Sequence, residues 1–268
     1  ALVIINALSS RLRETSEKSR MEAELKTAQV IQDTLFPEPE FKYEYLTISG
    51  HFQPASEIGG DWWFHSRIGT KVFLWIGDAT GHGAPAALLT SAARSAATVL
   101  ETLAFSPAKI LELMNRAIYD VSKGQMMMTF FLAAIDLKTK KMVYSNASHE
   151  PPLLLRKQGE VFKKSMIEPI NDVTSPRLGE ARDTKYEEAE IMIGPTDAIF
   201  FYTDGVEELR NKKKEALGDR GFMRAFVKCY HDFPVPNIFV ERLVNFFADY
   251  SQGTEVLDDV TFFVCRHD

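Results

Sequence analysis

Four short segments end an apolar run with a carboxylate next to glycine or to a second aspartate. They are Gly59-Gly60-Asp61, Gly77-Asp78, Thr203-Asp204-Gly205 and Asp258-Asp259. An unpaired charge at the end of a buried strand is costly, whereas several carboxylates that meet around cations are stabilised by them. Each segment alone is also typical of a plain turn. Their combination favours a site for hard divalent cations.

The chemistry that such a site supports follows from its donor atoms. Oxygen-only ligands favour Mg²⁺ or Mn²⁺, and a zinc hydrolase would require a His/Cys ligand spacing that is not found here. Two such ions can polarise a phosphoryl group and lower the pKa of a bridging water. No cysteine or serine stands in a recognisable nucleophile setting. The residues therefore predict attack by water on a phosphate ester.

Short strands and a few helices must position these carboxylates. We expect strands at 46–53, 57–65, 71–78, 129–136, 141–147, 152–156, 186–193, 197–203 and 260–266, and helices at 84–103, 106–122, 219–232 and 235–249. Several strands follow one another directly, which favours antiparallel pairing over repeated βαβ units. Trp62 and Trp63 alternate across a strand, so at least one is expected to fill the core, and the other is a candidate to line an interface.

Residues 1–36 are predicted to form one helix, because no glycine or proline occurs before Pro37. Met21, Leu25, Ala28, Gln32 and Leu35 recur with coiled-coil spacing. Two interpretations stay open: a helix that lies on its own domain, or a linker that forms a dimer. The sequence begins inside the apolar stretch 1–5, and we expect an upstream sensor domain before it.

Composition excludes several other classes of protein. The net charge is −6 and no basic stripe occurs, so nucleic acid is not an expected partner. No apolar run is long enough to span a membrane. Cys229 and Cys265 show neither disulfide nor ligand spacing, which favours the cytoplasm, although an upstream part could tether the protein to a membrane.

The chain resembles the bacterial branch of the protein phosphatase 2C (PPM) family, the SpoIIE/RsbU-type serine/threonine phosphatases. The resemblance covers residues 25–266 and rests on motifs in the same order as in the family. They are Gly59-Gly60-Asp61-Trp62-Trp63, Gly77-Asp78-Ala79-Thr80-Gly81-His82-Gly83-Ala84-Pro85, Met128-Thr129-Phe130, Tyr144-Ser145-Asn146-Ala147-Ser148-His149, Tyr202-Thr203-Asp204-Gly205 and Asp258-Asp259-Val260-Thr261.

The resemblance implies an α+β fold, a four-layer α/β/β/α sandwich of two mainly antiparallel sheets flanked by helices, at 37–268 after the linker helix at 1–36. It also implies two Mn²⁺ or Mg²⁺ ions. Asp78 would bridge them. Asp61 and the carbonyl of Ala79 would complete one site. Asp204 would complete the other with Asp258 or Asp259, of which Asp258 is favoured.

Other residues are expected to handle the substrate. His82 is assigned either as the acid that protonates the leaving oxygen or as a residue that caps its loop by hydrogen bonding. Gly81 and Gly83 allow backbone to approach an anion at the next helix start, and Gly60 is included in this substrate-binding set. Arg210 and Lys212 belong to a basic run that is either a solvated loop or a surface for an acidic phosphoprotein.

Two further residues complete the expectations. His149 is interpreted as structural. Ser148 stands where the family usually has glycine, and in a left-handed conformation it would cost about 1 kcal/mol. The predicted activity is dephosphorylation of a regulatory protein, by resemblance a STAS-type anti-sigma-factor antagonist, in a homodimer formed through the N-terminal helix. The alternative is a catalytically silent interaction module with the phosphatase fold.

Overall fold

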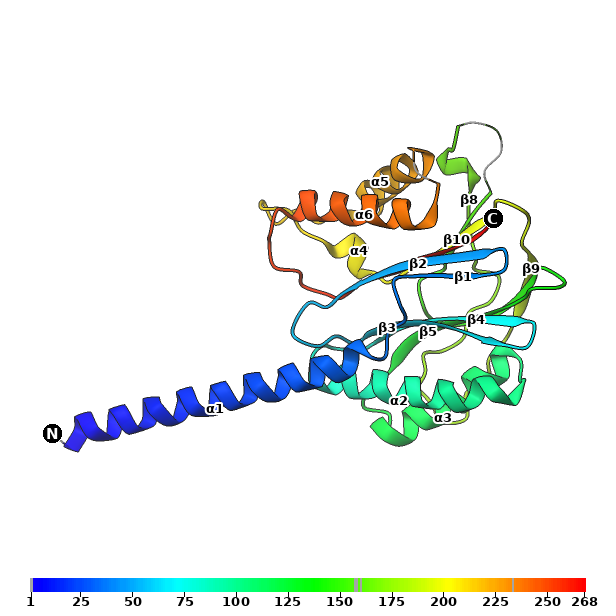
Figure 1. The fold of residues 1–268 in the computed structure, drawn as a ribbon. Coiled ribbons are helices and arrows are strands. Elements are labelled where there is room, and N and C mark those ends of the chain that lie inside the picture. Colours follow the sequence, from blue (N-terminus) through cyan, green and yellow to red (C-terminus); the bar gives the residue numbers. More distant parts are fainter. Residues whose placement is uncertain (1, 157–158, 160, 233) are drawn as a thin grey trace.

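The computed structural model describes residues 2–156, 159, 161–232 and 234–268, with only the backbone for 2–10 and Glu22. A long helix, α1 (Leu2–Asp33), projects from the body, and only its C-terminal end packs on the domain (Figure 1). It ends slightly before the predicted position 36, and Pro37 follows soon after. Within the described residues, no helix has both the length and the apolarity needed to cross a membrane.

Two antiparallel sheets form the centre of the molecule. The first has the strand order β1 (Glu40–Tyr43), β2 (Leu46–Gln53), β11 (Val260–His267), β10 (Ala198–Tyr202), β7 (Leu153–Leu155) and β8 (Ile167–Pro169). The second has the order β3 (Asp61–Ile68), β4 (Lys71–Ala79), β5 (Met128–Asp136), β6 (Lys141–Ala147) and β9 (Ala189–Met192). All ladders between these strands are antiparallel, as predicted.

Helices cover the outer face of each sheet (Figure 1). The second sheet packs against α2 (Ala84–Leu100) and α3 (Pro107–Ser122). The first sheet packs against α5 (Gly218–Asp232) and α6 (Pro236–Ser251). The short helix α4 (Gly205–Glu208) and the 3₁₀ turns η1 (Glu101–Leu103) and η2 (Lys164–Met166) connect these elements. The predicted four-layer α/β/β/α sandwich is confirmed.

Three buried clusters correspond to the three gaps between the four layers. Trp62 and Trp63 point to opposite faces of β3, and both are almost fully buried, at 0% and 2% exposed. Trp62 packs on the helix side, and Trp63 stacks on Phe263 between the sheets, with ring centroids 4.8 Å apart. The expectation that one of the two tryptophans lines an interface is therefore wrong, because both faces of this sheet are covered.

A few element boundaries differ from the prediction. The strand β3 begins at Asp61 and not at 57, because the preceding backbone leaves the ladder as a loop. The helix predicted at 84–103 stops at Leu100 and continues as the turn η1. Strands β1 and β8 and helix α4 were not predicted. They are only three or four residues long, too short for a hydrophobic period to be read.

Candidate metal and phosphoester site

The two sheets bring the predicted carboxylates to one edge of the sandwich. Asp61 begins β3 and lies directly opposite Asp78, near the end of β4. Directly opposite residues of an antiparallel pair project from the same face, roughly 5 Å apart at their Cβ atoms. By strand alternation this face is the one that carries Trp63 and Ile76, which pack between the sheets.

The other sheet supplies its carboxylates at the same edge. Asp204 follows β10, and Asp258 and Asp259 precede β11. Because β10 and β11 are antiparallel neighbours, the end of one lies beside the start of the other. Thr203 joins the two sheets, since its Oγ1 donates a hydrogen bond to Asp61 Oδ2 at 2.8 Å. Thr203 was missed by the sequence analysis, although it directly precedes Asp204.

Burial sets the electrostatics of Asp61 and Asp78. Asp61 is 1% exposed. Its burial, followed by the charges of Asp78 and Asp259, raises the pKa of this carboxyl well above its usual range. Burial also raises the pKa of Asp78 to about 7, and the charges of Asp204, Asp258 and Asp259 add to this effect. Buried carboxylates that repel one another are stabilised when a cation is bound between them.

Asp259 and Asp258 have different surroundings. Asp259 is 5% exposed, and its oxygens accept hydrogen bonds from three backbone N–H groups: Ala55 at 2.8 Å, Gly60 at 2.6 Å and Asp61 at 3.1 Å. Asp258 is half-buried, and its Oδ1 accepts the N–H of Asp259 at 2.8 Å. Partial burial raises the pKa of Asp258, and the charges of Asp204 and Asp259 act in the same direction.

A narrow cleft of about 40 Å³ lies among these groups. Its lining comes from both sheets and the connections after them: Asp78, Thr129, Ser148, His149, Glu150, Thr203 and Asp204. Within the described residues, no three His, Cys, Asp or Glu side chains already converge on one point as the ligands of a single ion would. Asp204 is exposed on its loop, unlike Asp61 and Asp78.

His149 lines this cleft as a neutral side chain. It is 5% exposed, and its Nδ1 shares a hydrogen bond of 2.9 Å with Thr129 Oγ1. Burial lowers the pKa of the imidazole to about 3. Its backbone N–H donates to Asn146 Oδ1 at 2.7 Å. These contacts agree with a structural role for His149.

The neighbouring Ser148 adopts the left-handed conformation, with φ 55°. Its hydroxyl donates to the carbonyl of Ser175 at 2.8 Å, which fixes the turn from outside. The serine thus takes the backbone angle for which the family pattern uses glycine.

The loop between β4 and α2 carries the remaining predicted residues on this side. His82 is exposed, and Gly81 and Gly83 have φ of 86° and 73°, which favour glycine. Ala79 is buried at the end of β4. Gly60 is also buried: its N–H is used by Asp259, and its carbonyl accepts the hydroxyl of Thr90 at 2.6 Å. Its substrate-binding role stays a prediction, and these contacts leave it little freedom to meet a ligand.

Arg210 and Lys212 lie around a hollow of about 380 Å³ next to the segment that leads to Asp258. Lys214, Glu255 and Leu257 also line it. Thr254 ties the two walls together, because its hydroxyl donates to the carbonyl of Arg210 at 2.6 Å. Arg210 and Lys212 are therefore exposed, and they lie close in sequence to Asp204. Their role in docking a substrate stays a prediction.

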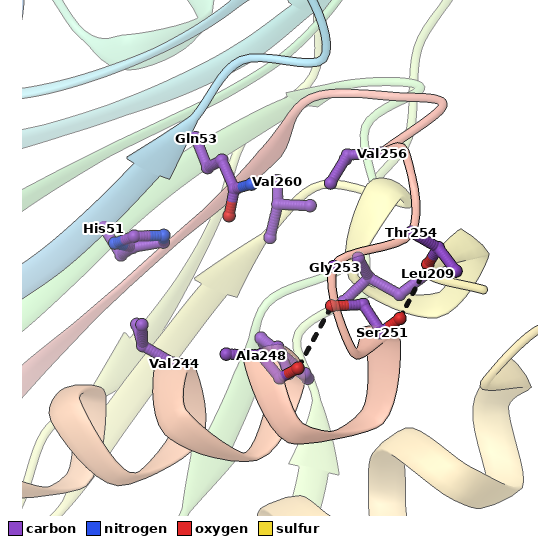
Figure 2. Close-up of a pocket in the computed structure, with 11 residues that line it drawn as sticks. His51, Gln53, Leu209, Val244, Ala248, Ser251, Gly253, Thr254, Val256 and Val260 are labelled. Atoms are coloured by element: carbon purple, nitrogen blue, oxygen red, sulfur yellow. Dashed lines mark hydrogen bonds between the residues drawn. The ribbon is translucent and has the colours of Figure 1, made fainter. Parts of the chain in front are cut away.

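A further hollow of about 200 Å³ lies on the outer side of the first sheet (Figure 2). His51 and Gln53 of β2 stand on one side of it, and Ser251 and Thr254 on the other. None of the described residues that line it is Asp, Glu, Lys or Arg. It offers no charge to a phosphate or to a cation, so the carboxylate edge remains the candidate site.

Comparison with known proteins agrees with this geometry. Residues 68–268 match the family model described as Stage II sporulation protein E (SpoIIE). The chain belongs to the SpoIIE family. The SpoIIE-family domain is 25% identical over 199 residues to phosphoserine phosphatase RsbU of Bacillus subtilis (strain 168), a match that covers 73% of this chain and 56% of that protein. It spans about half the length of the curated relatives it matches.

Solved structures confirm the fold of the SpoIIE-family domain. The SiaA-PP2C domain of Pseudomonas aeruginosa superposes with a TM-score of 0.74 at 20% identity, covering 94% of this chain and 99% of that one. The phosphatase domain of SpoIIE from Bacillus subtilis, with a fragment of its regulatory domain, gives a TM-score of 0.66 at 17% identity, covering 84% and 64%. The chain thus has the PP2C fold of the bacterial PPM phosphatases.

Proposed function

We propose that this chain is a metal-dependent protein serine/threonine phosphatase that hydrolyses a phosphoserine or phosphothreonine of a regulatory protein. The observation that carries the proposal is the pairing of Asp61 and Asp78 on adjacent strands, the first buried and the second partly buried, both with raised pKa values. Like charges held together inside a protein cost stability unless a cation compensates them. The family relationship and the relatives named as phosphoserine phosphatases support the same activity.

The donor set fits two Mn²⁺ or Mg²⁺ ions, because the carboxylates of Asp61, Asp78, Asp204 and Asp258 and the carbonyl of Ala79 all offer oxygen. Asp78 is central, Asp61 and the carbonyl of Ala79 belong on one side of it, and Asp204 and Asp258 on the other. Asp259 is better assigned to the support of the site, since its oxygens already accept three N–H groups. When bound, such ions would activate water and polarise the phosphoryl group.

The chain's own residues would orient the phosphoprotein. The exposed Gly81-His82-Gly83 loop stands at the start of α2, where backbone N–H groups favour an anion. His82 is accessible to protonate the leaving oxygen. Arg210 and Lys212 would hold acidic residues that flank the phosphorylated position.

The substrate class and the setting are part of the proposal. The relatives RsbU and RsbP, both named phosphoserine phosphatases, support a phosphorylated protein as the substrate. From the family resemblance we propose a STAS-type antagonist in the cytoplasm. The helix α1 would connect the domain to an upstream sensor domain. It exposes Leu12, Met21, Val30 and Ile31, each at least 60% accessible. A homodimer formed through this helix is part of the proposal.

The experiment compares Mn²⁺-dependent hydrolysis of p-nitrophenyl phosphate by the wild-type chain, by Asp78→Asn and by the control Asp249→Asn, an exposed carboxylate on α6. Loss of several kcal/mol of transition-state stabilisation corresponds to roughly 10³-fold or more in rate. We expect this loss for Asp78→Asn and none for the control. Equal rates for all three, or a wild-type chain that binds its phosphoprotein without hydrolysing it, would favour the silent interaction module.

A further inference from the structure

The side chain of Gln32 is the polar group through which α1 meets the acidic site. It lies in the last turn of α1 and is 4% exposed. Its Nε2 donates to the carbonyl of Gly59 at 2.7 Å, and its Oε1 accepts the N–H of the same residue at 2.9 Å. One amide thus satisfies both peptide groups of one glycine, as a neighbouring strand would. Gln32 occupies an apolar position of the coiled-coil repeat, a signal that the sequence analysis did not use.

Gly59 directly precedes the residues that build the site. The next two N–H groups, of Gly60 and Asp61, donate to Asp259 Oδ2. A Cβ atom on Gly59 would lie 2.4 Å from the same oxygen. Gln32, near the start of the chain, and Asp259, near its end, therefore bind consecutive peptide groups of the loop at residues 59–61. The close contacts leave no space for a side chain at Gly59.

A second contact joins the segment directly after α1 to strand β3, which follows this loop. The indole Nε1 of Trp62 donates to the carbonyl of Leu35 at 3.1 Å, just after the helix. An apolar side chain at position 32 could fill the space equally well, but it would leave the N–H and carbonyl of Gly59 without partners in the interior. Each such buried group costs about 1–3 kcal/mol, or the loop shifts to find another partner. The position of the loop therefore depends on the amide and not merely on packing.

We propose that Gln32 is a positioning residue of the metal site: it sets the path of Gly59, and through Gly60 and Asp61 it sets the carboxylates of Asp61 and Asp259. This inference rests on the proposed function. It predicts that changing a side chain outside the acidic cluster weakens cation binding. Outer partners of metal ligands are typically worth 10–100-fold in metal affinity.

The experiment measures Mn²⁺ affinity by electron paramagnetic resonance of free Mn²⁺, with hydrogen exchange at residues 59–61, at a temperature where every variant is folded. The variants of the full chain are Gln32→Leu and Gln32→Glu, which keeps the acceptor for the Gly59 N–H and removes the donor to its carbonyl. Gln29→Leu is the matched control, the same exchange on α1 at a half-buried position. We expect at least a 10-fold weaker Kd and faster exchange for both Gln32 variants, and no change for the control.

The possible outcomes separate the two proposals. If Gln32→Leu only lowers the melting temperature and binds Mn²⁺ like the wild type, Gln32 is a structural anchor and this inference is overturned. If Gln32→Leu does not fold, Gln32→Glu decides in the same way. If the wild-type chain binds Mn²⁺ no better than Asp78→Asn, the proposed function itself fails, whatever Gln32 does.

Discussion

The acidic site has two halves that the fold holds in different ways. Asp61, Asp78 and Asp259 lie where the two sheets meet, and strand pairing and backbone N–H groups fix them. Asp204 and Asp258 lie on the turns after β10 and before β11, one exposed and one half-buried. A bound cation would therefore relieve the repulsion among the carboxylates of the first half and would order the side chains of the second. The difference indicates that the electrostatic repulsion between carboxylates is concentrated in the buried half, and that the side chains of the exposed half change position when a ligand binds.

Replacing either Asp258 or Asp259 by asparagine is the strongest test of the difference between the two halves. In Asp259→Asn the amide NH₂ replaces an acceptor, so at least one of the three N–H groups, of which those of Gly60 and Asp61 are buried, loses its partner. We expect a loss of about 2 kcal/mol or more in the free energy of unfolding, measured in urea without divalent cations. In Asp258→Asn the amide oxygen can still accept the N–H of Asp259, so the change should stay within about 0.5 kcal/mol.

The affinity for Mn²⁺ also distinguishes the two variants, because here Asp258→Asn, the variant with little effect on stability, is expected to show a clear loss. Asp258→Asn removes an anionic ligand from the exposed half, and we expect at least a 10-fold weaker Kd at unchanged stability. If Asp258→Asn instead unfolds the chain and Asp259→Asn only loses Mn²⁺, the assignment of support and ligand is reversed.

The pH dependence of stability sharpens the comparison for the buried half. The folded pKa of Asp78, about 7, lies above the ordinary value of 3.8. A raised carboxyl pKa contributes stability that is fully present below about pH 3.8 and is lost as the pH rises through about 7. Without divalent cations, Asp78→Asn should remove this loss, so the variant should gain up to about 4 kcal/mol relative to wild type between pH 4 and pH 7.

Chemical unfolding at both pH values, in EDTA and in saturating Mn²⁺, measures this effect. In Mn²⁺ the wild type should instead become more stable as the pH rises, because the cation binds deprotonated carboxylates. A parallel pH profile for wild type and Asp78→Asn in EDTA would show that Asp78 is not held in an unfavourable charged state.

The sequence predicted the buried half better than its support. Asp61 and Asp78 were evident as carboxylates beside glycine and apolar strand-like runs, and the four-layer architecture followed from the family pattern. The hydrogen bonds from Gln32 and Thr203 were not predicted, because they join segments 27 and 142 positions apart in the chain. The apolar repeat position of Gln32 and the apolar run before Thr203 indicate burial, but not which backbone or side-chain group each residue meets. The alternative roles of Asp258 and Asp259 likewise required knowledge of which N–H groups face them.

The smallest expected effect concerns Ser148, which lines the cleft between the two halves. Ser148→Gly relieves a left-handed backbone, worth about 1 kcal/mol. It also loses the hydrogen bond to Ser175, worth about 1 kcal/mol, so the net change should stay within about 0.5 kcal/mol. Ser148→Ala keeps the strain and loses the bond, so it should be about 1 kcal/mol less stable than Ser148→Gly. Equal stabilities of the two variants in thermal unfolding would mean that this turn carries no strain, and a fall in activity of Ser148→Gly alone would show that the cleft requires a rigid turn.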